Sequence, residues 1–202
     1  MNLRLLGIIV GAFALGAIGA VGLHMANGGA TPRVKTSGEA LIGGQFTMVR
    51  DDGATVTQAD FKGKPLLIFF GFTFCPDVCP ATLQVTSEAL ELLGPQADDL
   101  NAVFVSVDPE RDTPEALTSY LADFDERITG LTGTKEQVAE IAKAWRVYYA
   151  RVADPNSAGG YTMDHSAYLY LMGPDGRYIR HFRPAVRADE LAAGIKPALG
   201  TS

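Results

Sequence analysis

The sequence predicts an α/β fold, in which helices cover both faces of a central β-sheet, and three observations support this class. Two continuous apolar runs of strand length, Pro65–Phe72 and Asn101–Val107, are typical of strands buried on both faces. Segments with helix start and stop signals alternate with these runs. Near the end of the chain, a GPDG turn at 173–176 separates two further apolar segments and indicates a hairpin.

The order of the elements follows from the same signals. A DDG turn at 51–53 separates Gln45–Val49 from Ala54–Val56 and indicates an N-terminal hairpin. A Gly-Pro pair at 94–95 stops the first helix, and a Thr-Pro-Glu start at 113–115 suits the cap and first turn of the second. Residues 154–164 are expected to form a polar loop. The predicted helices are Pro80–Leu93, Thr113–Phe124, Thr134–Trp145 and Arg187–Leu199, and the later strands are Val147–Val152, Ala167–Met172 and Arg177–Phe182.

Strand–helix alternation that closes with a hairpin and a helix is the thioredoxin-like order. The N-terminal hairpin is then an extension of that fold, and the helix at 113–124 is an addition to it. A chain of 202 residues is long enough for one such domain, which we assign to residues 39–202, together with an appendage.

The appendage is an apolar segment at the front of the chain, Leu5–Met25, in which His24 is the one residue that can become charged. As a helix its 21 residues would measure about 31 Å, enough to cross a bilayer core. The sequence therefore predicts a transmembrane anchor at 5–25, preceded by a cytoplasmic N-terminus at 1–4 and followed by a small, polar linker at 26–38. The alternative is a cleavable signal peptide cut near ANGGA, although such peptides usually have a shorter apolar core.

Charge and small residues in this segment predict its orientation and a pairing partner. Arg4 lies on the short N-terminal side, so the positive-inside rule places the rest of the chain across the membrane. The expected location is the bacterial inner membrane with the domain in the periplasm, or the mitochondrial inner membrane facing the intermembrane space. Gly7 and Gly11 form a GxxxG pattern, which suggests a possible homodimer.

Composition narrows the class of partner. The chain is 47% hydrophobic and 20% charged, as expected of a folded protein, and its net charge is −6. This balance argues against nucleic acid as a partner, because no basic patch dominates. Two cysteines four positions apart do not form a disulfide scaffold, and a domain of this length needs none.

The two cysteines lie in CPDVCP, directly after the first buried strand, where α/β sheets bind ligands. A helix that began at Pro76 would carry Pro80 one turn inside it, where proline removes a backbone donor and clashes. We therefore expect the helix to begin at Pro80, with Cys75 and Cys79 on the loop just ahead of it. The positive end of the helix dipole would then favour their thiolate forms.

The three-residue gap between these cysteines leaves three roles open: a structural disulfide, a redox pair, or two metal ligands. Two soft thiolates favour Cu(I) or Zn(II), and either ion usually takes a further ligand. Of the three histidines, His24 belongs to the apolar segment and His181 is expected at an edge or in solvent. His165 precedes an apolar strand, in a loop position that faces the active site of a thioredoxin fold. It is either the third ligand or a structural histidine, which is the usual role of a lone histidine.

Polar neighbours of these residues are candidates for supporting roles. Asp77 lies between the cysteines and either supplies an oxygen to Cu(II), contacts a partner, or is simply solvated. Asp164 either orients His165 through a hydrogen bond or caps the turn. Met163 is soft enough to assist Cu(I). In the DPERDTP loop, which contains Asp108, Pro109, Arg111 and Asp112, we expect Arg111 to pair with Asp108 or Asp112 and so brace the loop.

The chain resembles the Sco/SenC family of copper chaperones for cytochrome c oxidase assembly in the stretches GFTFCPDVCP, SVDPERDTP, GLTGT, WRVYY and DHSAYLYLMGPDG. These stretches cover nearly all of Leu66–Gly176, and the single N-terminal anchor matches as well. The resemblance implies a thioredoxin-like fold and one copper ion per chain, Cu(I) or Cu(II), bound by Cys75, Cys79 and His165. It also implies a role in building the dinuclear copper centre of the oxidase.

The leading hypothesis is therefore a membrane-anchored metallochaperone that delivers copper, with the copper-site subunit of the oxidase as its partner. In an oxidising compartment the cysteines tend to form a disulfide, so a thioredoxin-like reductant is a second expected partner. The alternative is a thiol-disulfide oxidoreductase that reduces the cysteines of the copper site or acts in redox sensing. A peroxidase is disfavoured because no isolated peroxidatic cysteine is present, and a zinc enzyme with an open fourth position remains possible in principle.

Overall fold

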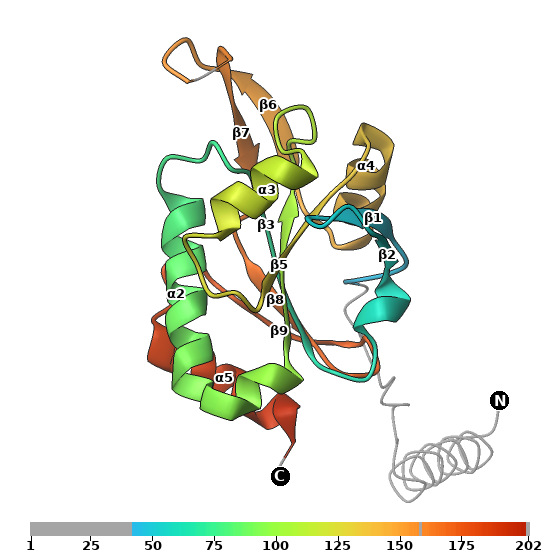
Figure 1. Ribbon diagram of the computed structural model, residues 1–202, viewed down its shortest axis with the longest axis vertical. Coiled ribbons are helices and arrows are strands. Elements are labelled where there is room, and N and C mark those ends of the chain that lie inside the picture. Colours follow the sequence, from blue (N-terminus) through green and yellow to red (C-terminus); the bar gives the residue numbers. More distant parts are fainter. Residues whose placement is uncertain (1–41, 158, 201–202) are drawn as a thin grey trace, which may run out of the picture. The chain divides into compact units, whose positions relative to one another are not determined.

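The computed structural model describes residues 42–157 and 159–200, which form a mixed seven-stranded sheet with helices on both faces (Figure 1). The strand order is β2-β1-β5-β4-β3-β8-β9. The anchor, linker and GxxxG pattern expected at 1–38 lie outside the described residues. Within the described part, no helix is both long and apolar enough to cross a membrane.

The centre of the sheet is built by the two apolar runs. Strand β3 (Leu66–Gly71) pairs in parallel with β4 (Asn101–Ser106), and all six of its residues are buried. On its other side β3 pairs antiparallel with β8 (Leu169–Met172), which continues into the edge strand β9 (Tyr178–Phe182). Both predicted central strands and the C-terminal hairpin are confirmed.

The predicted N-terminal hairpin is also confirmed, and it is joined to the centre by a strand that the sequence did not predict. Strands β1 (Thr47–Arg50) and β2 (Thr55–Thr57) pair antiparallel. Strand β5 (Ile128–Thr132) lies between β1 and β4 and is parallel to β4. Its five residues include two threonines and a glycine, so no long apolar run marks it, and its pairing with two neighbours supplies the stability that its composition lacks.

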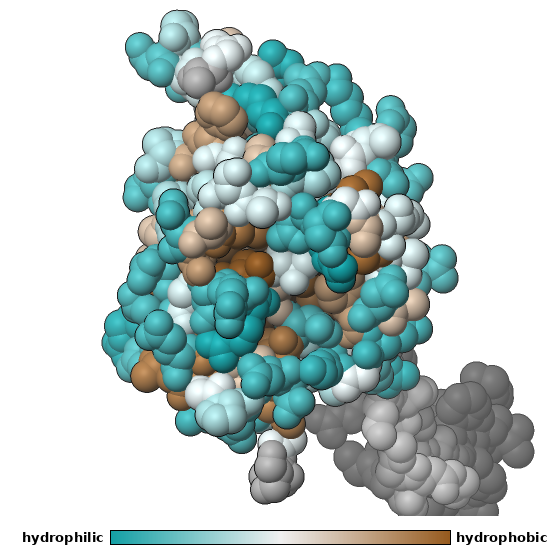
Figure 2. Space-filling model, viewed as in Figure 1, coloured by the Kyte–Doolittle hydropathy of each residue, from teal (hydrophilic) through white to brown (hydrophobic). Residues whose placement is uncertain are grey.

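Helices divide the core into two layers. Helices α2 (Val78–Leu93), α3 (Pro114–Leu121) and α5 (Ala188–Leu199) pack on one face of the sheet, and α4 (Lys135–Ala144) packs on the other. Two short 3₁₀ helices lie in connecting segments: η1 (Gln58–Phe61) between β2 and β3, and η2 (Gly94–Asp99) between α2 and β4. In the view of Figure 1 the surface is mostly hydrophilic, and apolar side chains gather in the middle of this face (Figure 2). Helices on both faces were predicted and are present.

The start of α2 differs from the prediction. The helix begins at Val78 with Asp77 as its N-cap, so Pro80 is its third residue and Cys79 lies in its first turn. Proline is tolerated there because backbone N–H groups of the first turn have no partner inside the helix. The carbonyl four residues before Pro80 belongs to Pro76, which lies outside the helix, so the expected clash does not arise. Cys75 alone is on the loop.

The segment expected as a polar loop is in part a strand. Strands β6 (Tyr149–Ala153) and β7 (Tyr161–His165) form a separate two-stranded sheet, the β6–β7 ribbon, which projects beyond the main sheet (Figure 1). His165 is therefore the last residue of a strand rather than a loop residue, and it pairs in register with Tyr149. The ribbon places this histidine beside the N-terminus of α2.

Candidate metal centre

Three side chains from two distant parts of the chain meet at the carboxyl end of β3. The Sγ atoms of Cys75 and Cys79 and a ring nitrogen of His165 all lie within 4.8 Å of one another. The Sγ atom of Cys79 is 3.7 Å from Nε2 of His165, across 86 positions of sequence. Both cysteines are free thiols, Cys79 fully buried and Cys75 half-buried.

A glycine makes room for the buried sulfur. A Cβ atom at Gly71, the last residue of β3, would lie 2.7 Å from Sγ of Cys79 and 2.7 Å from the ring of Phe104. Real Cβ atoms do not approach other atoms so closely, so only glycine lets the first turn of α2 lie against the strand end. The backbone N–H of Cys79 in turn points at Sγ of Cys75, at 3.4 Å.

The imidazole of His165 is held with one nitrogen facing the sulfurs. Its Nδ1 lies 3.2 Å from the carbonyl oxygen of Ser166, which makes Nδ1 the protonated nitrogen and leaves the lone pair on Nε2. The ring packs edge-on against Phe72 at 5.7 Å and Phe69 at 6.3 Å between centroids. These two aromatic rings restrict the orientation of the histidine.

The two thiols differ in how readily they lose a proton. The pKa of Cys75 is lowered to about 4, chiefly because the Cys79 thiol donates a hydrogen bond to it. Backbone N–H groups of Asp77 and Cys79 also stabilise its thiolate. The pKa of Cys79 is raised, because its proton is hydrogen-bonded to the Cys75 thiolate and the side chain is buried. Cys75 is therefore the nucleophile of the pair.

This asymmetry predicts selective alkylation of the reduced protein. Iodoacetamide should modify Cys75 and leave Cys79 unmodified, since Cys79 is fully buried and keeps its proton. Because Cys75 is already a thiolate, its rate should change little between pH 6 and 8, where an ordinary thiol would accelerate by about tenfold per pH unit. Peptide mass spectrometry after timed quenching measures both effects, and a rate that climbs steeply over this range would contradict the assignment.

A buried carboxylate ties the cysteine loop to β4. Asp112 accepts hydrogen bonds from the backbone N–H of Thr73 at 3.1 Å, from its hydroxyl at 2.6 Å, and from the hydroxyl of Ser106 at 2.5 Å. Burial raises the pKa of Asp112, and these donors partly offset that effect. The start of the CPDVCP loop is fixed in this way.

The DPERDTP loop, to which Asp112 belongs, also holds the β6–β7 ribbon. Arg111 pairs with the buried carboxylate of Asp108, as predicted, and also donates to the backbone carbonyl of Tyr161 at 3.1 Å. The Tyr161 hydroxyl donates to Asp108 at 2.9 Å. The tyrosine ring lies between the guanidinium groups of Arg111 and Arg151, whose central carbons are 3.8 and 3.6 Å from its centroid. Tyr161 thus anchors the strand that ends at His165.

Removing the hydroxyl of this anchor should destabilise the domain. In Tyr161→Phe the ring and both guanidinium contacts remain, but Asp108 loses a hydrogen bond in a buried site, which typically costs about 1–3 kcal/mol. Urea unfolding of the wild type and the variant measures the loss. Tyr148→Phe is the matched control, because Tyr148 is 59% exposed and should tolerate the change. Equal stability of the two variants would contradict the anchoring role.

The remaining candidates lie as follows. Asp77 caps α2 through its backbone only, and its side chain is exposed. Asp164 is exposed on β7, and within the described residues it forms no hydrogen bond with His165. The backbone carbonyl of Ser166 orients the imidazole instead, a role that was expected of Asp164. Met163 packs against both core layers. His181 is exposed on β9, as predicted, with Tyr178 at 2.6 Å, and takes no part in the site.

The sequence did not predict the supporting roles of four residues at the site. Three of them stand just before the CPDVCP motif, namely Gly71, Phe72 and Thr73, and the fourth is Tyr161. A glycine at the end of an otherwise bulky apolar strand was the available signal for close approach of another group. The donor set itself fits a soft metal ion, since thiolate and imidazole ligands suit copper and zinc. The same three groups can also support thiol chemistry at Cys75.

The chain is similar in sequence and in structure to known proteins of one family. Residues 34–200 match the family described as SCO1/SenC. The human "Protein SCO1 homolog, mitochondrial" is 40% identical over 165 residues, which are 81% of this chain and 54% of that protein. The copper-bound structure of ScoI from Bradyrhizobium japonicum is 46% identical, with a TM-score of 0.72, and covers 78% of this chain and 99% of the solved one.

A third relative connects the fold with a function. BsSco is described as a member of the Sco family of cytochrome c oxidase assembly proteins and as having a disulfide switch; it is 28% identical, with a TM-score of 0.61, covering 77% of this chain and 92% of the solved chain. The chain thus has the thioredoxin-type α/β fold of these structures. It spans about half the length of the human relative.

Proposed function

Because the chain belongs to the SCO1/SenC family, we propose that it is a metallochaperone that binds one copper ion through Cys75, Cys79 and His165. It delivers the ion during assembly of the dinuclear copper centre of cytochrome c oxidase, and the copper-site subunit of that oxidase is its partner. The observation that carries the proposal is the meeting of two thiols and an oriented imidazole within 4.8 Å.

The arrangement supports binding followed by release. Cys79 and His165 are held by packing, whereas Cys75 is half-buried on a loop, so a competing thiolate of a partner has access to one ligand before the others. The low pKa of Cys75 supplies a thiolate at neutral pH without a separate base. Of the two thiols, only Cys79 would still have to lose its proton when the ion, Cu(I) or Cu(II), binds.

The setting of the domain is part of the proposal. Residues 5–25 anchor the chain in the bacterial inner membrane or its mitochondrial counterpart, residues 1–4 are cytoplasmic, and residues 26–38 link the anchor to the domain at 39–202. The domain lies in the periplasm or the intermembrane space. There the cysteines need a thioredoxin-like reductant before copper binds. Pairing of anchors through Gly7 and Gly11 would give a homodimer.

One observation favours a second candidate function. Cys75 has the lowered pKa and the partial exposure of an attacking thiol, and Cys79 is adjacent to resolve a mixed disulfide. The alternative is therefore a thiol-disulfide oxidoreductase that reduces the cysteines of the copper site. Both functions use the same pair of cysteines, but only copper binding needs His165.

A transfer experiment separates the two functions. The reduced full chain, loaded with one equivalent of Cu(I) without oxygen, is mixed with the reduced apo form of the copper-site domain. Chaperone activity predicts that copper moves to the domain. Reduced, copper-free chain mixed with the disulfide form of the domain tests the alternative. Rapid reduction of that disulfide, with no copper transfer in the first experiment, would reject delivery.

In cells, Cys75→Ser should lower oxidase activity, with recovery on added copper. Stoichiometric zinc without copper in purified protein would reject the copper assignment.

A further inference from the structure

A cavity lies at the opposite end of β3 from the candidate metal centre. It has a volume of about 220 Å³ and is bounded by the first residue of β3, Leu66, and the last residue of β8, Met172. The six residues of β3 separate it from the cysteine loop by about 20 Å. The cavity therefore shares no lining residue with the copper site and needs a separate explanation.

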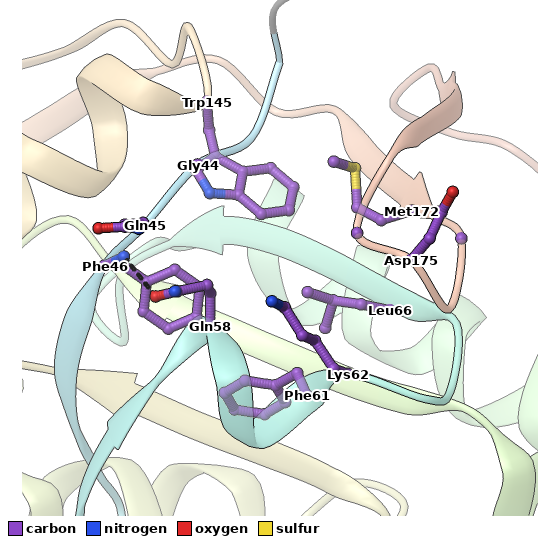
Figure 3. Close-up of a pocket in the computed structure, with 12 residues that line it drawn as sticks. Gly44, Gln45, Phe46, Gln58, Phe61, Lys62, Leu66, Trp145, Met172 and Asp175 are labelled. Atoms are coloured by element: carbon purple, nitrogen blue, oxygen red, sulfur yellow. Dashed lines mark hydrogen bonds between the residues drawn. The ribbon is translucent and has the colours of Figure 1, made fainter.

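Three aromatic side chains form part of the wall of this cavity. Phe46 and Phe61 pack at 5.9 Å between ring centroids, and Trp145 closes the opposite side (Figure 3). Phe46, Leu66, Trp145 and Met172 are each more than 90% buried. A volume of 220 Å³ is below the 300–1,000 Å³ of most drug-sized sites, so it suits a compound with a single ring.

One polar group beside the cavity is closed off from it. Trp145 is 2% exposed, and its indole Nε1–H is buried without a hydrogen-bond partner in the described part of the chain. In Figure 3 this nitrogen is on the side of Gly44 and Gln45, which also line the cavity. The nitrogen itself has almost no accessible surface, so Trp145 contributes ring atoms to the wall and does not offer its N–H to a ligand.

Two other donors do line the cavity. The Oε1 atom of Gln58 accepts from the backbone N–H of Phe46 at 3.1 Å, so its NH₂ group remains available. The Lys62 side chain extends into the opening, and among the described residues it forms no ion pair (Figure 3). The acid at the rim, Asp175, is already engaged with the backbone N–H of Arg177 at 3.0 Å and with the Arg177 guanidinium.

We propose that this cavity, between η1, the end of β8 and Trp145, binds a small aromatic carboxylate. The ring would lie between the aromatic side chains, and the carboxylate would accept from Gln58 and Lys62. This inference is independent of the proposed copper function, because no residue of the cavity is a candidate ligand.

Benzoate is the probe, and the chain offers a specific reporter. Trp145 is the only tryptophan, so its indole N–H gives one cross-peak in a ¹H–¹⁵N spectrum of the full chain. Titration with benzoate at constant ionic strength should shift this peak in a saturable manner, because the bound ring lies beside the indole, with half-saturation between about 0.1 and 10 mM for a ligand of this size. Benzyl alcohol, which has the ring without the carboxylate, should bind more weakly.

Matched charge variants test the geometry. Lys62→Gln should weaken benzoate binding by about three- to tenfold. Lys64→Gln removes the same charge two residues away, where the lysine donates to the carbonyl of Asp98 rather than lining the cavity, and should leave binding unchanged. Copper stoichiometry should be the same in all three proteins. An indole peak that does not move up to about 50 mM benzoate, or equal weakening by both variants, would overturn the proposal.

Discussion

Replacing His165 with alanine is expected to weaken Cu(I) binding at least about 100-fold, more than the 10–100-fold that changes outside the ligand set usually cause. The imidazole is the only non-sulfur ligand in the proposed set, and its Nε2 already faces Cys79 at 3.7 Å. Removing it leaves two thiolates and an apolar hollow beside Phe72, with no replacement donor identified among the described His, Cys, Asp and Glu side chains.

Anaerobic competition against a coloured Cu(I) chelator measures this affinity. His181→Ala is the matched control, since His181 is exposed on β9 and lies outside the site. It should bind copper as the wild type does. A His165→Ala protein with unchanged affinity and unchanged absorption spectrum would remove His165 from the ligand set, while a control that lost affinity would show that the effect is general.

Gly71→Ala is expected to impair both stability and copper binding. Glycine is disfavoured inside a strand, so its replacement by alanine would ordinarily stabilise the fold by about 0.5–1 kcal/mol. Here the added methyl group would lie 2.7 Å from both Cys79 Sγ and the Phe104 ring, and overpacking of this kind costs about 1–3 kcal/mol. The sign of the change in unfolding free energy therefore decides whether the close contact is real.

The copper affinity of this variant should fall as well, because Cys79 must move away from the strand. Gly53→Ala provides the comparison: Gly53 has a φ of +86° and no neighbouring atom within 4 Å, so alanine there strains the backbone without crowding any side chain. It should lose stability and keep its copper affinity. If Gly71→Ala retained wild-type affinity, β3 would not be what positions Cys79.

The parts of the fold that could be predicted are those whose signals are local. The two central strands are marked by their own apolar runs, and the start of α3 is marked by Thr113, whose hydroxyl caps the helix as expected. Strand β7 is different, because its polar residues are held by contacts of Tyr161 with Asp108 and Arg111 from another loop. No periodicity within residues 154–164 reports those contacts.

The candidate site was predictable to a different extent for each residue. The cysteines stand out by their position after a buried strand, but the placement of Cys79 inside α2 depended on where a proline is tolerated. His165 lies 86 positions from Cys79, and its approach is set by the ribbon and by rings on β3. Its position before an apolar strand made it a candidate, and resemblance to a family assigned it as a ligand, since spacing alone does not relate groups so far apart.

The β6–β7 ribbon gives a bound ion a mechanical role. The ribbon has its own hydrogen-bond ladder and is a two-stranded sheet apart from the main one, so it can open as a local unit while the rest of the domain stays folded. In the proposed site, an ion held by Cys79 of α2 and His165 of the ribbon would cross-link these two units. The copper affinity would then include the cost of keeping the ribbon closed, and amide exchange in residues 149–165 should slow when copper binds. Weakening the Tyr161 anchor would loosen the metal without touching any ligand.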